Sequence, residues 1–159
     1  MTATETTASA VGGPWLSVEQ QQVWRSYLLG SARLVVRLAA ELREFGLDLG
    51  EYEILVRLSE APGQRVRMAE LADSVQQSRS RLTHTVGRME AAGLVERVSC
   101  PSDRRGVWAH LTNGGLTLLE SAAPAHVRSV RQYFVAAMSE SDYAALGRAF
   151  TGVSDACEE

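Results

Sequence analysis

The stretch from Met68 to Leu111 decides the fold. It reads MAELADSVQQSRSRLTHTVGRMEAAGLVERVSCPSDRRGVWAHL. Its central segment predicts a helix after Ser78, because a serine hydroxyl at an N-cap accepts a hydrogen bond from an otherwise unpaired backbone N–H. Leu82, Val86 and Met89 fall within about 60° of arc on this helix, so they form one apolar stripe.

The opposite face of this helix is polar. No Asp or Glu occurs from Ser78 to Gly87. A helix that is apolar on one side, and cationic and hydroxylic on the other, fits the major groove of DNA. Ordinary surface exposure is the alternative for each polar residue, and Arg79 could instead pack against the neighbouring helix. The expected DNA contacts are Ser78, Arg79, Ser80, Arg81, Thr83, His84 and Arg88.

The preceding segment predicts the first helix of a helix-turn-helix. Met68, Leu71 and Val75 recur at helical spacing, and only Gln76 and Gln77 separate this segment from the next helix. A connection that short forces a large crossing angle between the two helices.

The segment that follows Gly93 predicts a wing. Gly93 favours a helix end, because glycine adopts the left-handed conformation without steric cost. Residues 94–98 and 107–111 predict two strands, with Val107, Ala109 and Leu111 on one face. The residues between the strands, from Pro101 to Gly106, predict a turn-forming loop at the tip.

These residues resemble the MarR (multiple antibiotic resistance regulator) family of winged-helix transcription factors. The pattern is LADSV…SRSRLTHTVGRMEAAGLVER…SDRRGVWAHLTNGG. Its most specific part is Asp103-Arg104-Arg105, followed six residues after Arg105 by Leu111-Thr112. The resemblance covers roughly residues 20–150 in helix order and length. The chain departs from the family at Arg67, where a Ser or Thr N-cap is usual, and at Gln76, where the turn often has Gly.

The resemblance implies a role for the wing. The second Arg of the motif, here Arg105, is expected to enter the minor groove, where the narrow groove concentrates negative potential. Asp103 would orient that side chain through a charge-assisted hydrogen bond. The alternatives are a solvated hairpin tip for Arg104 and Arg105 and a plain turn-initiating role for Asp103.

The fold class expected is mainly α with a small β-hairpin wing. We divide the chain into a disordered tail at 1–13, a helical dimerisation region at 14–46 and 112–159, and a winged helix-turn-helix at 47–111. The terminal segments hold more apolar surface than the winged unit needs, so they can form an interface with a second copy. A twofold dimer places two recognition helices about one DNA turn apart, matching a pseudo-palindrome.

Composition sets the remaining bounds. The net charge of −3 alone argues against nucleic acid, but residues 65–105 hold eight Arg and five acids, a local charge of +3. Cys100 and Cys157 form neither a metal-binding spacing nor a disulfide framework. No run of 18 apolar residues and no signal peptide is visible, so we expect a cytoplasmic protein without a cofactor.

Four residues could line a small-molecule pocket. The resemblance implies an anionic aromatic ligand between the dimer helices and the winged unit, and core packing is the alternative for each residue. The candidates are Trp24, Tyr27, Arg33 and Tyr52. Trp108 is expected to be exposed, with DNA contact, a partner and packing within the dimer all open.

The function expected is that of a homodimeric repressor that binds a pseudo-palindromic operator and is released by a small ligand. A winged helix used as a protein-interaction module is one alternative, and redox sensing through Cys100 is another. Catalysis is disfavoured, because His84, His110 and His126 lie in separate contexts with no nucleophile, metal set or phosphate loop.

Overall fold

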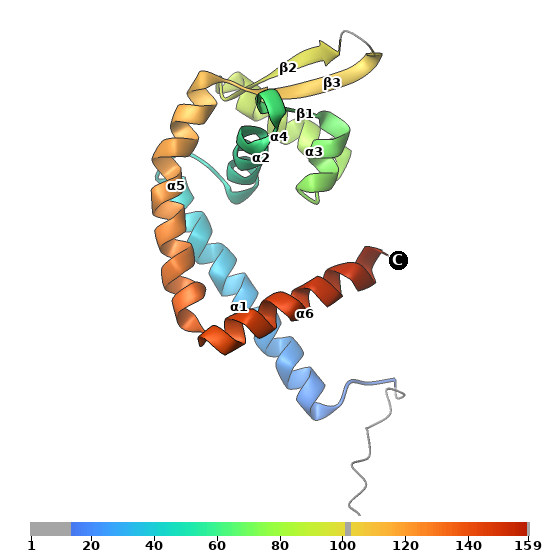
Figure 1. Ribbon diagram of the computed structural model, residues 1–159, viewed down its shortest axis with the longest axis vertical. Coiled ribbons are helices and arrows are strands. Elements are labelled where there is room, and N and C mark those ends of the chain that lie inside the picture. Colours follow the sequence, from blue (N-terminus) through green and yellow to red (C-terminus); the bar gives the residue numbers. More distant parts are fainter. Residues whose placement is uncertain (1–13, 101–102, 159) are drawn as a thin grey trace, which may run out of the picture. The chain divides into compact units, whose positions relative to one another are not determined.

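The computed structural model describes residues 14–100 and 103–158, with the backbone alone at 100, 103–105 and 158. Contacts divide the chain into one unit that ends at Arg33 and a second unit, Leu34–Glu159, which holds the winged helix. The architecture is mainly helical with one small sheet, as the sequence predicts (Figure 1). The elements are α1 (Val18–Arg43), α2 (Leu49–Glu60), η1 (Pro62–Gln64), β1 (Arg65–Arg67), α3 (Met68–Ser74), α4 (Arg79–Ala91), β2 (Val95–Cys100), β3 (Asp103–Leu111), α5 (Asn113–Tyr133), η2 (Val135–Ala137) and α6 (Glu140–Glu158).

Capping boxes start both α1 and α2. Before α1, the backbone N–H of Gln20 donates to Ser17 Oγ at 3.1 Å, and the Gln20 side chain accepts from the Ser17 N–H at 2.9 Å. Before α2, Asp48 and Glu51 exchange the same pair of bonds at 2.8 and 3.1 Å. Each box satisfies backbone donors that a helix start leaves unpaired, so both starts are encoded locally.

The turn between α3 and α4 is held by a left-handed residue. Gln76 has φ of 51°, in the region that normally favours glycine. The N–H of Gln77 donates to Ala72 O at 3.0 Å and that of Gln76 to Asp73 O at 3.2 Å, the two bonds of a Schellman motif. The Gln76 side-chain amide also donates to Asp73 O at 3.0 Å, which satisfies a carbonyl at the end of α3.

The core is built around α4. Ser78 caps this helix by accepting from the Arg81 N–H at 3.3 Å, and Gly93, with φ of 74°, follows its end, as predicted. The predicted stripe of Leu82, Val86 and Met89 is buried, with at most 1% of each residue exposed. It packs in one cluster with residues of α2, α3 and the sheet, which include Leu55, Leu58, Leu71, Val95 and Leu111.

The sheet has three antiparallel strands in the order β1-β3-β2. The sequence analysis missed β1, whose Arg65 pairs with His110 and whose Arg67 pairs with Trp108. Ala109 and Leu111 face the core as predicted, but Val107 is 39% exposed, because the outer end of the hairpin extends beyond the core.

The wing strands are longer than predicted. The prediction of a loop from Pro101 to Gly106 was wrong for residues 103–106, because β3 begins at Asp103 and pairing continues to Cys100 opposite Asp103. Residues 101 and 102 lie outside the described residues. The ladder shifts register between Ser99 and Cys100, an irregularity of the bulge type that disrupts the ladder locally.

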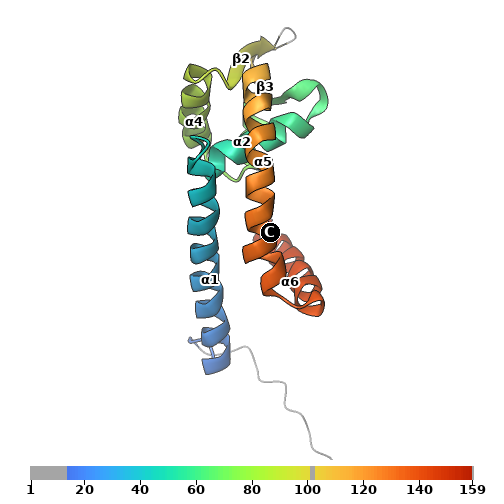
Figure 2. The ribbon, with the colours of Figure 1, turned by 90° about the vertical axis from the view of Figure 1, so that its left-hand side faces the viewer.

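A close backbone approach joins the sheet to α5. The Thr112 hydroxyl lies 2.7 Å from Gly93 O and 3.0 Å from Leu94 O, and it accepts the Gly115 N–H at 3.0 Å. A Cβ placed on Gly115 would lie 2.1 Å from Leu94 O. Only glycine therefore fits at this position, and α5 leads from there away from the sheet (Figure 2).

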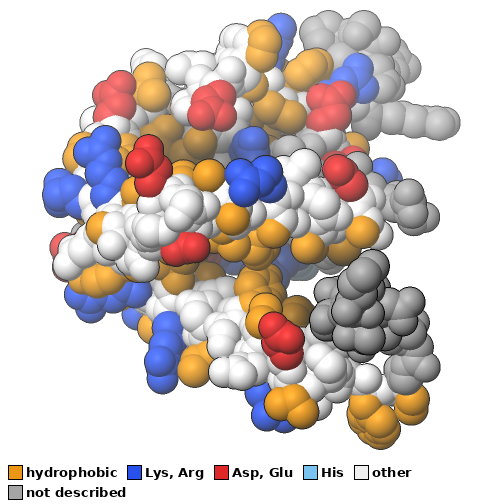
Figure 3. Space-filling view, turned by 60° about the horizontal axis from the view of Figure 1, so that its bottom comes forward, with side chains coloured by type: hydrophobic (Ala, Val, Ile, Leu, Met, Phe, Trp, Pro, Cys, Tyr) orange, Lys and Arg blue, Asp and Glu red, His pale blue; other side chains and the backbone are white. Residues whose placement is uncertain are grey.

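The segment 112–159, expected to be helical, forms α5 and α6, with a short 3-10 turn between them. Pro124 lies inside α5. Apolar side chains remain at the surface of α6, where Tyr143, Phe150 and Val153 are 46%, 42% and 55% exposed. Hydrophobic side chains are visible among charged ones on the face shown in Figure 3.

Adjacent aromatic rings join α2 to α5. The Tyr52 ring, 9% exposed, lies 4.5 Å between centroids from the ring of His126. His126 Nδ1 is buried without a hydrogen-bond partner among the described residues. Burial lowers the pKa of His126 below its ordinary value of 6.5, because the charged form loses hydration there.

Gly115→Ala should destabilise the fold. The new methyl group would force the start of α5 away from β2, and such overpacking costs about 1–3 kcal/mol. Gly147→Ala is the matched control, since nothing lies within 4 Å of a Cβ at that helical position. Thermal unfolding should show a clearly lower Tm for Gly115→Ala and an equal or higher Tm for the control. Equal melting of all three proteins would refute the close approach.

The His126 ring should make stability fall in mild acid. The folded protein binds fewer protons at this ring than the unfolded chain does, so stability is complete above pH 6.5 and declines below it. The Tm difference between pH 7.5 and 5 should therefore shrink in His126→Gln. The exposed His84 supplies the control, and His84→Gln should keep the wild-type difference. An unchanged pH dependence in His126→Gln would contradict the assignment.

Candidate nucleic-acid interface

The polar residues expected on the recognition helix form one exposed surface. Arg79, Ser80, Arg81, Thr83 and His84 are all exposed on the first turns of α4, next to the exposed cap Ser78. The Thr83 hydroxyl donates to Arg79 O at 2.8 Å, so its Oγ remains able to accept. No acidic residue lies in the first turn of α4. The apolar stripe on the buried side fixes which residues face outwards.

Arg88 differs from these residues, although it is also exposed. Its Nη2 lies 2.9 Å from Glu51 Oε1 and 3.2 Å from Asp48 Oδ2. The guanidinium is therefore bound by two carboxylates of α2. A direct DNA contact by Arg88 stays a prediction from the sequence, and this geometry gives the side chain a competing role.

A basic cleft of about 420 Å³ lies between the sheet and the helix-turn-helix. Its cationic residues come from three elements: Arg67 from β1, Arg79 from α4 and Arg97 from β2. Thr83 adds a hydroxyl to the lining, and Gly106 and Val107 form the side towards the wing. Three guanidinium groups around one open cleft are suited to an anion such as a phosphate group.

Hydrogen bonds between Arg97 and Glu90, which the sequence did not predict, hold one side of the cleft. Arg97 donates through Nε and Nη2 to Glu90 Oε2 at 2.9 and 2.6 Å, which ties β2 to the end of α4. Its guanidinium and its backbone N–H together hold the pKa of Glu90 below the ordinary value. Arg97 thus keeps a fixed position beside the cleft.

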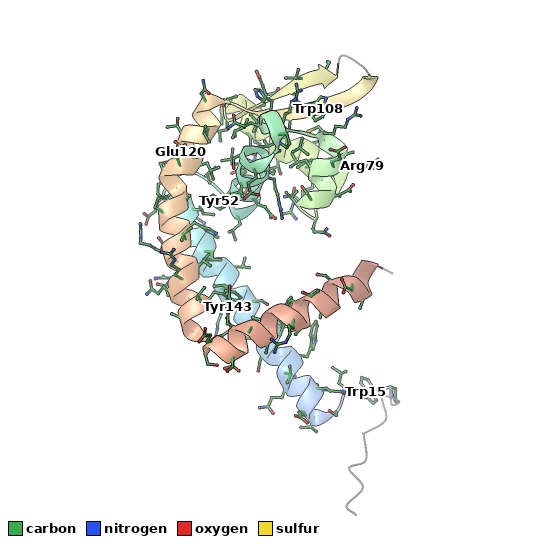
Figure 4. The ribbon with its side chains drawn as sticks, in the orientation of Figure 1. Trp15, Tyr52, Arg79, Trp108, Glu120 and Tyr143 are labelled. Carbon is green, nitrogen blue, oxygen red and sulfur yellow. The ribbon has the colours of Figure 1, made fainter. Side chains whose placement is uncertain are left out.

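Trp108 supports two further arginines. The guanidinium carbons of Arg65 and Arg67 lie 5.2 and 5.4 Å from the centre of the Trp108 ring. Such cation–π contacts orient an Arg side chain over the aromatic ring. Trp108 is only partly exposed, against the expectation of an exposed side chain. Its packing against Arg65 and Arg67 is a role that the sequence did not predict, and DNA contact, a partner and packing within the dimer stay open. Figure 4 labels Trp108 on β3 and Arg79 on α4.

The sequence analysis missed Arg65, Arg67 and Arg97 as site residues. The alternation Arg-Val-Arg at 65–67 was the available signal, since it places two arginines on one face of a strand. That strand was not predicted, so the signal was not recognised.

The wing residues lie at the edge of what the structure describes. The backbone of Asp103, Arg104 and Arg105 belongs to β3. Their side chains, like that of Cys100, are outside the described residues. The minor-groove role of Arg105, the orienting role of Asp103 and the redox alternative at Cys100 stay predictions.

The residues expected to bind a small ligand fall into both units of the chain. In α1, the rings of Trp24 and Tyr27 stack with centroids 5.6 Å apart, and about half of each side chain is exposed. Arg33 is exposed on the same helix. Tyr52 belongs to the second unit, where it is buried against His126, which favours the core alternative for this residue. The ligand-binding role of all four stays a prediction.

Comparisons with known proteins identify the family. The MarR family model matches residues 45–106, which include α2 and the helix-turn-helix. AbsC, a MarR family transcriptional regulator from Streptomyces coelicolor, is 42% identical over 92% of this chain and 99% of its own, with a TM-score of 0.89. The chain belongs to the MarR family. This MarR protein is therefore a transcriptional regulator, in a family of regulators rather than enzymes.

Two further structures resemble this MarR regulator. Sco3205 of Streptomyces coelicolor, a MarR family transcriptional regulator in complex with DNA, is 40% identical over 91% of each chain, with a TM-score of 0.88. Sco5413 of the same organism is 19% identical over 89% of this chain and 97% of its own, with a TM-score of 0.77, so it supports the fold alone. No curated protein matches the chain. Among the described residues, no helix is both long and apolar enough to cross a membrane.

Proposed function

We propose that this regulator binds double-stranded DNA with the exposed face of α4 in the major groove. The observation that carries the proposal is the continuity of two surfaces: the acid-free face from Ser78 to His84 and the basic cleft that begins at Arg79. The DNA complex of Sco3205, 40% identical to this chain, supports the same use of the fold. Sequence would be read by α4, since base edges are distinguishable in the major groove.

The cleft has a defined part in this proposal. A DNA strand that leaves the major groove beneath α4 and passes towards the wing would cross Arg79 and Arg97. Backbone phosphates are the anions present there, and contacts to them set the register of a protein on DNA without reading sequence. The wing would complete the interface through Arg105 in the minor groove, with Asp103 orienting it.

The proposed active form is a homodimer. Large apolar side chains of α1 are exposed, among them Val18, Val23 and Val36 at 87%, 66% and 65%. Exposed apolar groups in such number mark an interaction surface. A second copy is the occupant that also explains twofold DNA recognition, because two copies of α4 would match the two halves of a pseudo-palindrome.

The direction of regulation completes the proposal. A dimer bound across an operator blocks transcription, so the function proposed is that of a repressor acting in the cytoplasm. Release by a small aromatic or anionic ligand is proposed from Trp24, Tyr27 and Arg33 of α1, whereas the burial of Tyr52 against His126 favours a core role for that residue. The stacked pair of rings on α1 is the feature that supports an aromatic ligand.

Sedimentation should show a dimer. A pure sample at micromolar concentration should give about twice the chain mass of 17.3 kDa, because apolar surface of this extent is unfavourable in water. Val23→Glu, which places a charge on the exposed surface of α1, should shift the equilibrium to monomer. A wild-type monomer that still binds a palindromic duplex tightly would exclude the dimer.

Substitutions on α4 should separate base from phosphate contacts. Arg81→Ala or His84→Ala should weaken binding to an operator selected from a random duplex library by about 1–3 kcal/mol if the side chain reads a base. A phosphate contact would weaken all sequences alike and lower the salt slope by about one. Arg57→Ala on α2 is the control for general charge loss. Wild-type binding by both α4 variants would mean that another face contacts DNA.

A further inference from the structure

Arg88 connects the end of α4 to the start of α2. It belongs to the last turn of α4, and its Nη2 reaches the first turn of α2. The sequence predicts that Arg88 contacts DNA, yet its hydrogen bonds are made to Asp48 and Glu51. Its position on the surface and its bonding therefore suggest two different roles.

Asp48 and Glu51 each use one carboxylate oxygen for the capping box and the other for Arg88. Asp48 uses Oδ1 to accept the Glu51 N–H at 2.8 Å and Oδ2 to accept from Arg88 at 3.2 Å. Glu51 uses Oε2 to accept the Asp48 N–H at 3.1 Å and Oε1 to accept from Arg88 at 2.9 Å. One atom of Arg88 thus bridges both members of the capping box. The box fixes both carboxylates before the arginine binds, so little side-chain freedom is lost on the acidic side.

The local charge does not suit a phosphate contact. Asp48 and Glu51 together carry −2 and Arg88 carries +1, so the cluster is net negative. A phosphate that approached Arg88 would also approach Asp48, which is as exposed as Arg88 at 58%. Like charges at such separations repel. Arg88 adds little positive potential for DNA.

The cluster formed by Arg88 and the capping box lies beside Arg81 and His84, the residues proposed to read DNA. Arg88 lines a polar hollow of about 270 Å³ together with Asp48 of the capping box and with Arg81 and His84 of α4. Gly50 permits the close approach of α2, since a Cβ there would lie 3.1 Å from the Gln77 side-chain nitrogen. A small movement of α2 against α4 would change the surroundings of both Arg81 and His84.

We propose that Arg88 is a positioning residue, which clamps α4 to the capping box of α2 and holds Arg81 and His84 in register with DNA. The proposal rests on the proposed reading of DNA by α4. It assigns Arg88 no contact with phosphate or base. It also gives Asp48 and Glu51 a second role beyond starting a helix.

The first test uses Arg88→Met, which keeps much of the side-chain length and removes the charge. Operator affinity should fall by up to about fivefold, because a clamp can favour the aligned state only by as much as its own ion pairs contribute. The dependence of log affinity on log salt should keep its slope, because no phosphate contact is lost. The Tm should change by about 2–4 °C at most, since exposed ion pairs contribute little to stability. Arg88→Lys should recover part of the affinity.

The second test removes the clamp and keeps the helix cap. Gln serves in a capping box as Glu does, so Glu51→Gln leaves α2 capped and weakens its hold on Arg88. Operator binding should weaken about fivefold, whereas binding to random duplex should not weaken. Charge alone predicts tighter binding to every duplex, because an acid is lost. Glu53→Gln, two residues on and paired only distantly with Arg57 at 3.8 Å, is the charge-matched control.

The double variant tests whether Arg88 and Glu51 act through one shared interaction. Arg88→Met with Glu51→Gln should bind operator no more weakly than Arg88→Met alone, because both changes break one interaction. A salt slope lower by about one in Arg88→Met, or tighter operator binding by Glu51→Gln, would show that Arg88 contacts DNA and overturn the clamp. Failure of the wild-type protein to select any operator would instead refute the proposed function.

Discussion

The burial of one face of α4 is the constraint on which the rest of the winged unit depends. Leu82, Val86 and Met89 are all at most 1% exposed, and full burial of such side chains is worth about 1.5–3 kcal/mol each. Rotation of the helix by one residue would turn this stripe through about 100° towards water. The hydrophobic effect therefore sets which residues point outwards, and the polar face needs no interaction of its own to be presented. Both ends of α4 are fixed as well, by the Ser78 cap and by the left-handed Gly93.

Several acids near this surface are bound to arginines of α4 and β2. The chain carries a net charge of −3, but exposed charges farther apart than about 8 Å are largely screened at physiological salt. Local pairs therefore matter more than the total. Glu90 binds Arg97, and the two acids of the α2 capping box bind Arg88. The remaining exposed cations of α4, Arg79 and Arg81, are placed at its N-terminal turns.

Local signals account for what the sequence predicted correctly. The cap at Ser78, the helix end at Gly93 and the apolar stripe of α4 depend on residues a few positions apart. The strand β1 could not be found in this way, because three residues carry almost no periodicity and their partners lie over 40 positions later. The wing strands were predicted too short for a related reason, since their outer pairs are not marked by buried apolar residues.

In the candidate site, too, local features were predicted from the sequence and long-range contacts were not. The exposed face of α4 followed from helical geometry, so Arg81 and His84 could be named in advance. The ion pairs of Arg88 join residues 37 and 40 positions apart, and no pattern within one element specifies them. The same holds for the placement of Arg67 and Arg97 around the cleft and for Trp108 beneath Arg65. Sequence periodicity gives the face of an element, whereas the partner of each side chain on that face is a tertiary property.

These tertiary contacts give α2 a central place in the winged unit. Glu51 binds Arg88 of α4, and the next residue, Tyr52, packs its ring against His126 of α5. Successive helical residues point about 100° apart. A single turn of α2 therefore contacts α4, the recognition helix, on one side and α5 on the other. Figure 4 labels Tyr52 at this position. The contact of α2 with α5 is between the buried ring of Tyr52 and the partly buried ring of His126, and its contact with α4 is an ion pair. Rings in close contact resist separation, because parting them exposes apolar area or leaves a void. Exposed ion pairs are worth about 0–1 kcal/mol and re-form readily. A displacement of α5 would therefore carry Tyr52 and the start of α2 with it, and the weaker junction at Arg88 is the place where the displacement would be felt by α4.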